Sequence, residues 1–336
     1  MKNFLFLFFI LFLSFSVFIF YAKSPNDYPA QREINLPPTM NAAAQIHPFF
    51  TLISYNMGYA SGNKNNRPVA LSEAEIEKNL SEMNGTLWKL HADVIALQEV
   101  DLDAARTFHI DQMNRLALGL QIQHMAYAVT WNKRYVPWPY WPIATQFGKM
   151  ISGQAVLSRY PIVEHQVFDF PKPRSNPFWY NWFYIDRKVQ KVVIEIAENR
   201  RVTIWNVHLE AFDEVTRTEQ TEALIELIRT DLKKTRVSQP TFVLGDFNSP
   251  SDFDPTAKTA SIKKWEKSRK DIALFLEKTG LMLASGEWSI PSWKPVKKID
   301  HIFYDGVLIP LVVSGTVTGI KASDHLPVWG SFELAK

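Results

Sequence analysis

The sequence predicts an α/β fold in which two stacked β-sheets are covered on their outer faces by helices. Short apolar runs typical of buried strands alternate along the chain with amphipathic helical patterns. Some strands follow one another directly, such as residues 189–196 and 201–208, so one parallel sheet cannot hold them all. At 46% hydrophobic and 21% charged residues, the 336-residue chain has enough apolar material for a large core.

The amino-terminal segment is apolar enough to cross a membrane. Residues 4–21 carry no charge, and a run of this length is just sufficient for a transmembrane helix. Large residues precede Ala22, where a signal peptidase prefers small ones, so we expect residues 1–23 to be an uncleaved anchor. Lys2 and Lys23 flank the span and bias its orientation only weakly. We expect a single-pass membrane protein with a cytoplasmic amino end and an extracytoplasmic domain.

Residues 24–47 are rich in proline and poor in large apolar side chains, which predicts an extended linker before a domain at 48–336. The chain has no cysteine, which excludes disulfides and thiolate metal sites. With 37 basic and 34 acidic residues, it has no overall charge that would attract nucleic acid. We expect a monomer.

Within this domain, local signals predict the order of the elements. Ser72 and Glu75 form a capping box before a helix that continues to about His91. Amphipathic or charged patterns predict further helices at 111–118, 214–234 and 258–278. Apolar runs predict strands at 49–55, 93–98, 122–130, 154–157, 241–244, 298–304 and 328–334.

The segment 240–250, PTFVLGDFNSP, places polar side chains at the end of a buried strand. We expect Gly245 to end the strand and turn the backbone. If the strand pattern continues, Asp246 and Asn248 share one face while Phe247 points into the core. An Asx-type turn before Pro250 is the alternative interpretation of this segment alone.

Other predicted strands and loops carry similar polar residues, and together they form a candidate site. Carboxylates, amides and imidazoles suit Mg²⁺ or Mn²⁺ with substrate phosphate, and the histidines suit acid–base chemistry on a phosphoester. No glycine-rich loop for nucleotide phosphates is present. The candidate residues are Asn56, Glu99, His208, Asp246, Asn248, Asp300, Asp324 and His325.

Six short motifs that contain these residues resemble, in order and spacing, the endonuclease/exonuclease/phosphatase superfamily, whose fold is that of DNase I. They are SYNMG, ALQEV, NVHLE, VLGDFNSP, IDHIF and ASDHLPV. Each is weak alone, but six in register are specific. The resemblance covers residues 48–336 and implies a four-layer sandwich of two face-to-face mixed β-sheets flanked by helices, here with an added amino-terminal transmembrane helix.

The resemblance also implies roles for the candidate residues. Asn56, Glu99 and Asp324 correspond to metal-site residues, with Glu99 the direct ligand. Asp246 and Asn248 correspond to the pair that orients the attacking water. For the remaining three, the resemblance implies a phosphate contact or general acid in His208, a general base in His325, and its carboxylate partner in Asp300. Where the family often has an aromatic residue after this aspartate, the chain has His301.

Three readings of the substrate follow. Two aromatic loops, 131–142 and 177–184, together with the anchor favour a lipid headgroup phosphodiester, as for the family's sphingomyelinases. The basic run 258–278 and the lysines beside Asp300 favour a nuclease acting on DNA or RNA. GDFNSP lacks the arginine-bearing continuation of inositol 5-phosphatases. An inactive membrane-tethered binding domain would require a missing catalytic residue, and none is missing.

Overall fold

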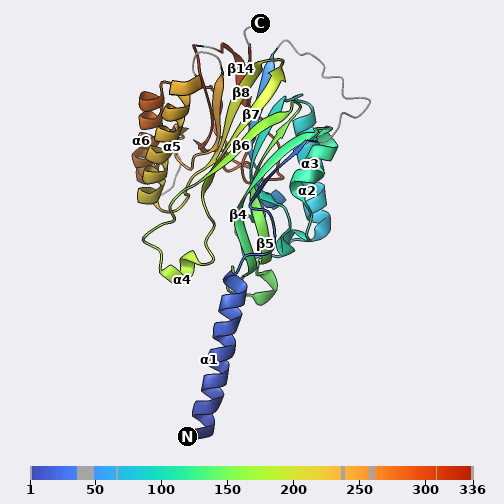
Figure 1. Ribbon diagram of the computed structural model, residues 1–336, viewed down its shortest axis with the longest axis vertical. Coiled ribbons are helices and arrows are strands. Elements are labelled where there is room, and N and C mark those ends of the chain that lie inside the picture. The colour runs from blue at the N-terminus through green and yellow to red at the C-terminus, as the bar shows by residue number, and fades with distance from the viewer. Residues whose placement is uncertain are drawn as a thin grey trace.

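Two mixed β-sheets lie face to face between two layers of helices in the computed structural model (Figure 1), which confirms the predicted four-layer sandwich. The structure describes residues 2–35, 49–65, 67–235, 239–256, 262–307 and 309–333. The first sheet has seven strands in the order β1-β4-β5-β3-β2-β15-β14, and the second has six in the order β11-β13-β9-β8-β7-β6. Apolar side chains from both sheets fill the space between them, among them Leu52, Val94, Ile204 and Phe242.

The bounds of the strands agree with most of the apolar runs in the sequence. The first sheet contains β1 (Gln31–Asn35), β2 (Phe50–Asn56), β3 (Val94–Asp101), β4 (His124–Val136), β5 (Gly148–Ser158), β14 (Leu311–Thr316) and β15 (Val328–Phe332). The second contains β6 (Ile162–Asp169), β7 (Lys188–Ala197), β8 (Arg200–His208), β9 (Thr241–Asp246), β11 (Met282–Leu283) and β13 (Asp300–Tyr304). A small separate pair is formed by β10 (Asp252–Phe253) and β12 (Lys297–Lys298).

Helices cover the outer face of each sheet. On the first sheet lie α2 (Glu73–Trp88) and α3 (Gln112–Leu120), and the predicted capping box of Ser72 and Glu75 is present at the start of α2. On the second lie α5 (Glu214–Thr235) and α6 (Ile262–Thr279). Residues 258–261, predicted to begin the last helix, lie outside the described residues.

The amino-terminal helix α1 (Lys2–Lys23) extends away from the sandwich (Figure 1). Its stretch Asn3–Lys23 has a mean hydropathy of 2.7 and is not buried against the rest of the chain. Length and composition therefore suit either a membrane span or a signal sequence.

Part of the segment predicted to be an extended linker forms a strand of the first sheet. Residues 31–35 form the edge strand β1, which pairs antiparallel with β4. Upstream of it, the backbone N–H of Arg134 donates to the carbonyl of Ser24, and Asn26 is hydrogen-bonded to Asn132. The open edge of β4 offers unpaired backbone groups, which this segment satisfies despite its prolines. Residues 36–47 of the predicted linker lie outside the described residues.

Two further local expectations need correction. The strand predicted at 122–130 extends into the loop predicted at 131–142, because β4 continues to Val136 and the prolines begin only at Pro137. Gly245 was expected to end its strand, but it lies inside β9, opposite Val207 and His301. A Cβ on Gly245 would lie 1.9 Å from the carbonyl oxygen of Val207, so the residue is required for close strand approach.

His301 lies in the interior of the second sheet. Its ring lies 5.6 Å from the rings of Phe247 and Phe303, and its Nε2–H donates to the carbonyl of Ser249 at 2.9 Å. Burial, and to a lesser degree the charge of Lys298, lower the pKa of His301 to about 3. The imidazole is therefore neutral and structural in the folded protein.

A methyl group at Gly245 cannot fit without separating β8 from β9. We expect Gly245→Ala to lower the free energy of unfolding by about 3 kcal/mol, measured by urea denaturation. Gly85→Ala is the matched control, because it adds the same methyl group in α2 where nothing lies within 4 Å. It should raise stability by about 0.5–1 kcal/mol. Equal effects of the two substitutions would contradict the role given to Gly245.

Buried His301 should make the fold sensitive to acid. The unfolded chain binds this proton below about pH 6.5 and the folded chain only near pH 3, so stability falls as pH drops through this window. His301→Phe should cost about 1 kcal/mol at pH 7 through the lost hydrogen bond. It should also reduce the loss of unfolding free energy between pH 7 and pH 5 by about 2 kcal/mol. An unchanged pH dependence would refute this assignment.

Candidate active site

The candidate residues gather where two parallel strand pairs end. In the first sheet β2 and β3 run parallel, with Asn56 opposite Gln98. In the second, β8 and β9 run parallel, with His208 opposite Asp246, and the antiparallel β13 begins with Asp300 opposite Asp246. Because the sheets face each other, their strand ends supply side chains to one site from both sides.

Asp246 is at the centre of this site. Its Oδ2 accepts a hydrogen bond from the Asn56 side-chain amide at 3.0 Å, which links the two sheets directly. Its Oδ1 accepts from the backbone N–H of Asn248 at 2.8 Å. Phe247 is fully buried, as predicted for the residue between them. Burial, followed by the nearby Asp300 carboxylate, raises the pKa of Asp246 to about 6.

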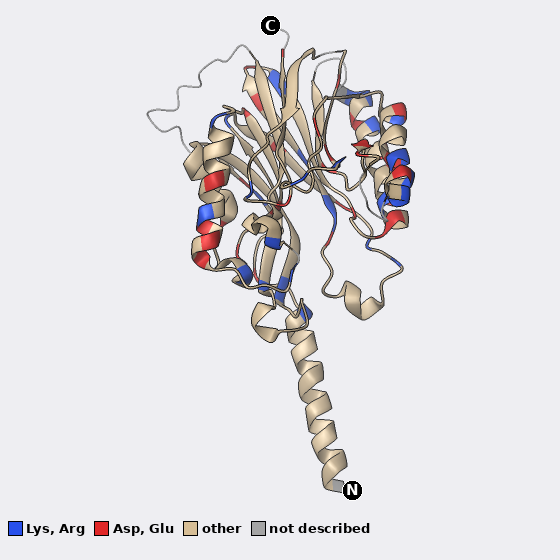
Figure 2. Cartoon of the chain, turned by 180° about the vertical axis from the view of Figure 1, so that it is seen from behind, with Lys and Arg blue, Asp and Glu red and all other residues tan. Residues whose placement is uncertain are grey.

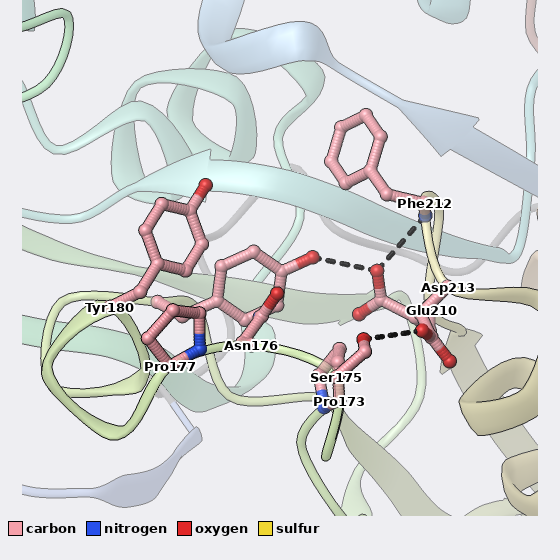
Figure 3. A pocket seen from close by; sticks show the side chains of 9 residues that line it. Pro173, Ser175, Asn176, Pro177, Tyr180, Glu210, Phe212 and Asp213 are labelled. Carbon is pink, nitrogen blue, oxygen red and sulfur yellow. Dashed lines mark hydrogen bonds between the residues drawn. The ribbon is translucent and has the colours of Figure 1, made fainter.

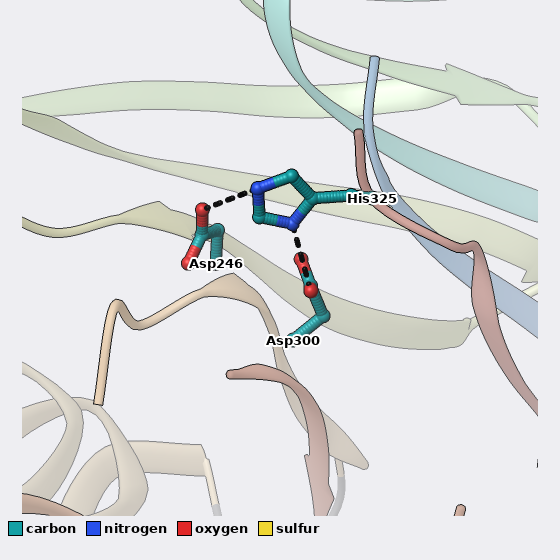
Figure 4. Close-up of side chains that lie close together, drawn as sticks. All are labelled: Asp246, Asp300 and His325. Carbon is teal, nitrogen blue, oxygen red and sulfur yellow. Dashed lines mark hydrogen bonds and ion pairs between the residues drawn. The ribbon is translucent and has the colours of Figure 1, made fainter. Parts of the chain in front are cut away.

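His325 lies between two carboxylates (Figure 4). Its Nδ1–H donates to Asp300 Oδ2 at 2.9 Å, while its Nε2 faces Asp246 Oδ2 at 3.8 Å. Burial alone would lower the pKa of His325, but the charge and hydrogen bond of Asp300 raise it to about 10. Asp300 also accepts from the hydroxyl of Ser289 at 2.5 Å, which fixes the carboxylate orientation.

Glu99 occupies an irregular position in β3. The pairing of β3 with β5 shifts register between Leu97 and Val100, and Glu99 within this bulge has a φ of +53°. That left-handed conformation is costly for a glutamate and is typical of a functional position. Asn65 donates to Glu99 Oε2 at 2.9 Å and to Asp324 Oδ1 at 3.3 Å, so the two acids share one amide.

His208 faces the centre of the site from β8. Its Nε2 lies 3.8 Å from Glu99 Oε1 and 3.7 Å from Asp246 Oδ2. Burial, and then the charge of Arg187, lower the pKa of His208 well below its ordinary value. A neutral imidazole here can donate a hydrogen bond through its one N–H, but it lacks the second proton that an imidazolium gives up as a general acid.

The Asn248 side chain is held by the backbone of a neighbouring loop. It has a φ of +50°, so the strand pattern ends before it. Its side-chain amide donates to the carbonyl of Leu209 at 3.0 Å. The loop behind it is held by Arg217 of α5, which is fully buried and donates to Ser249 Oγ at 3.0 Å and to the carbonyl of Glu210 at 3.1 Å.

The site has the donor chemistry for a divalent cation. Asp246, Asp300 and His325 each offer a ligand atom, and these atoms lie within 4.8 Å of one another, so this buried group could hold a metal ion. Burial, and after it the charge of Asp324, raises the pKa of Glu99. Burial, and after it the charge of Asp300, raises the pKa of Asp246 in the same way. Oxygen-rich, negatively charged surroundings fit Mg²⁺ or Mn²⁺.

Three residues at the site were not identified from sequence. Asn65 lies in a polar loop that carries no distinctive spacing. Glu210 ends the motif NVHLE and was passed over because only the histidine in it was assigned a role. Arg187 stands alone before β7, and no sequence pattern marks it. Its guanidinium is 5% exposed, and its Nε and Nη1 have no hydrogen-bond partner among the described residues.

Several solved structures have a similar fold. An endonuclease/exonuclease/phosphatase from Beutenbergia cavernae DSM 12333 aligns with a TM-score of 0.58 and 19% identity, covering 86% of this chain and 72% of that one. A mannosyl-6-phosphatase from Bacteroides thetaiotaomicron VPI-5482 aligns with a TM-score of 0.57 and 16% identity, covering 84% of this chain and 99% of that one. The catalytic domain of human Nocturnin with bound sulfate aligns with a TM-score of 0.56 and 16% identity, covering 92% of this chain and 100% of that one.

At these identities the structures show the fold alone. A search of curated protein sequences found no match. The sequence description of the endonuclease/exonuclease/phosphatase family, in contrast, matches residues 53–325, which begin inside β2 and end at His325. Because this match covers more than half of the chain, the protein belongs to the endonuclease/exonuclease/phosphatase family.

Proposed function

We propose that this protein is a membrane-tethered, metal-dependent phosphodiesterase that acts on a lipid headgroup. The observation that carries the hydrolase assignment is the convergence of Glu99, His208, Asp246 and the Asp300–His325 pair at one buried set of strand ends. Paired carboxylates and imidazoles at this spacing are suited to in-line attack of water on a phosphoester.

Each residue has a role that follows from its contacts. The hydrogen bond to Asp300 holds Nδ1 of His325, so Nε2 is directed at the space beside Asp246, where an attacking water would lie. Asn56 and the backbone of Asn248 fix the Asp246 carboxylate for orienting that water. Neutral His208 is suited to donating its Nε2–H to a phosphate oxygen.

The charge state of His325 depends on what else the site holds. A pKa near 10 favours the imidazolium, which cannot accept a proton from water. A divalent cation at Glu99, with Asn56 and Asp324 nearby, would balance charge on the phosphate and favour neutral His325. The His325 base role therefore implies a metal-loaded enzyme.

The lipid assignment is supported by an aromatic surface at the end of the domain where α1 leaves it. We define this surface by the exposed side chains of Trp138, Tyr140, Trp141, Ile143, Phe178 and Trp179. Trp141 is 75% exposed and Phe178 is 70% exposed. Figure 1 shows α4 (Phe178–Asn181) and the β4–β5 connection beside the domain end of α1. Exposed apolar patches and aromatic rings are typical of a membrane interface.

Contacts with α1 hold both aromatic loops at this end. The ring of Tyr135 lies 5.6 Å from Phe18, and that of Trp182 lies 6.4 Å from Phe20. The Lys23 ammonium lies 3.9 Å from the Trp182 ring. Lys and Arg residues, blue in Figure 2, also occur along the chain at this end of the domain, where they would meet lipid phosphates. We infer that α1 is an uncleaved anchor and that the domain lies against the bilayer on the extracytoplasmic side.

A nuclease is the alternative, and the observation that favours it is the basic outer face of α6. Lys263, Lys264, Lys267 and Lys270 are exposed there (Figure 2). Of the lysines beside Asp300, however, Lys298 is buried and donates to the carbonyl of Ala284, so it is unavailable to a nucleic acid backbone. An inactive binding domain is the least supported reading.

Removing either central group should abolish turnover. We expect His325→Ala and Asp246→Ala to lower the rate of phosphodiester hydrolysis at least about 100-fold, measured with the full-length protein in detergent micelles and Mg²⁺. Circular dichroism should show an unchanged fold. His109→Ala and Asp169→Ala are matched controls at exposed positions and should keep full activity. Wild-type rates in either active-site variant would reject the assignment.

The substrate class can be separated with the same protein reconstituted in vesicles. We expect Mg²⁺-dependent headgroup release from mixed phospholipid vesicles, reduced about tenfold by joint replacement of Trp138 and Trp141 with alanine, because the domain would lose interfacial contact. Plasmid nicking that weakens as salt rises, without headgroup release, would instead identify a nuclease. Absence of both activities and of metal binding would leave the inactive domain.

A further inference from the structure

A cavity of about 310 Å³ lies beside the candidate active site, between the α4 loop and the segment that follows β8. It is lined by three aromatic rings and two carboxylates, with Ser175 at one end (Figure 3). The rings belong to Tyr180, Tyr184 and Phe212, and the carboxylates to Glu210 and Asp213. Among the described residues that line it, none is a lysine, arginine or histidine.

Glu210 is a buried carboxylate in the wall of this cavity. The residue is fully buried, and its Oε1 accepts from the Tyr184 hydroxyl at 2.6 Å and from the backbone N–H of Phe212 at 2.9 Å. Its Oε2 has no hydrogen-bond partner among the described residues and lies 3.5 Å from Arg187 Nε. Arg187 thus balances part of the Glu210 charge, and the partly buried Asp213 is the carboxylate that a ligand in the cavity can reach.

The other polar groups that line the cavity also favour a positively charged ligand. The Ser175 hydroxyl donates to Asp213 at 2.6 Å and, with the backbone N–H of Thr216, lowers the pKa of Asp213, so this carboxyl stays ionised. The Asn176 amide already donates to Asn181. Ring faces together with carboxylates and few free donors are the surroundings in which alkylammonium groups bind.

The cavity also lies next to the candidate active site, where the phosphate would react. Glu210 follows His208 by two residues at the end of β8. Arg187, which pairs with Glu210, lowers the pKa of His208 and also interacts with Glu99. Arg187 thus contributes one positive charge among the carboxylates of the candidate site. Glu210 and Asp213 give the cavity negative charge, which complements the ammonium group of a headgroup whose phosphate lies at that site.

We propose that this cavity binds the ammonium group of a zwitterionic phosphodiester headgroup, such as a choline or ethanolamine ester, while its phosphate lies at Glu99, His208 and Asp246. This inference rests on the proposed hydrolase function and adds the headgroup class to it. The α4 loop that forms one wall also carries Phe178 and Trp179 of the aromatic surface, so the cavity lies close to where a lipid headgroup would enter.

Two esters that differ only in charge test the proposal. The p-nitrophenyl ester of phosphocholine and its neutral-carbon analogue, p-nitrophenyl 3,3-dimethylbutyl phosphate, would be hydrolysed by the full-length protein in non-ionic detergent with Mg²⁺. We expect kcat/KM to be about tenfold higher for the charged ester, equivalent to about 1.4 kcal/mol. Tyr180→Leu and Asp213→Asn should each reduce this ratio at least about threefold.

Glu214→Gln is the matched control for Asp213→Asn. Glu214 is the next residue along the chain, pairs with Lys267 at 3.0 Å and does not line the cavity, so its substitution should leave the ratio unchanged. Hydrolysis of both esters by the wild type at equal kcat/KM would overturn the ammonium assignment and leave the hydrolase function intact. A preference for glycerol- or sugar-bearing phosphodiesters would overturn it in the same way.

Calorimetric titration separates binding from turnover. Phosphocholine should bind about tenfold more tightly than 3,3-dimethylbutyl phosphate, and Asp213→Asn should remove most of this difference. If neither ester is hydrolysed but this difference in binding remains, the cavity assignment stands and the proposed hydrolase function fails. Equal binding of the two phosphates would overturn the cavity assignment whatever the catalytic result.

Discussion

The geometry of the site depends on a buried hydrogen-bond network that joins the two sheets. Asn206 of β8 donates to the carbonyls of Leu97 and Ala155 in the opposite sheet, and its Oδ1 accepts from Gln98 at 2.7 Å. All these groups lie inside the sandwich, where an unpaired amide would be costly, so the network permits few alternative registers between the sheets. Glu99 follows Gln98, and His208 lies two residues after Asn206. The network therefore determines how the strand ends that carry the candidate residues face each other across the two sheets.

Beyond this network, the strand ends concentrate like charges in a buried space. Burial and neighbouring carboxylates raise the pKa of Glu99 and Asp246, while Glu99 also adopts a strained backbone conformation. Such an arrangement lowers the stability of the folded chain, and structures keep it where it serves binding or catalysis. Close approach of β8 and β9 at Gly245 and the buried Arg217 behind the loop hold this strained constellation in place. The rest of the sandwich is thus stable enough to hold a site whose crowded carboxylates and strained backbone are unfavourable in the absence of ligands.

The amino-terminal segment connects this site to a surface. Because residues 24–35 are hydrogen-bonded along β4, the domain is held close to the end of α1 and is not separated from it by a free spacer. Both aromatic loops lie at that end, and one of them also forms a wall of the cavity beside Glu210. The proposed anchor, the aromatic surface, the cavity and the proposed phosphate site therefore lie on connected parts of the chain, an arrangement suited to a substrate that arrives from a bilayer.

The sequence alone determined the class of fold, the capping of α2, most strands and the choice of eight polar candidate residues at or near strand ends. These are local properties, since hydrophobic periodicity, caps and short motifs depend on neighbours in the chain. Only the tertiary structure decided that β1 closes the edge of β4, that Gly245 lies inside a strand, and that Asn65, Arg187 and Glu210 join the site. Each of these depends on contacts between segments far apart in sequence. Arg187, for example, pairs with Glu210 and lowers the pKa of His208, and no spacing along the chain predicts either interaction.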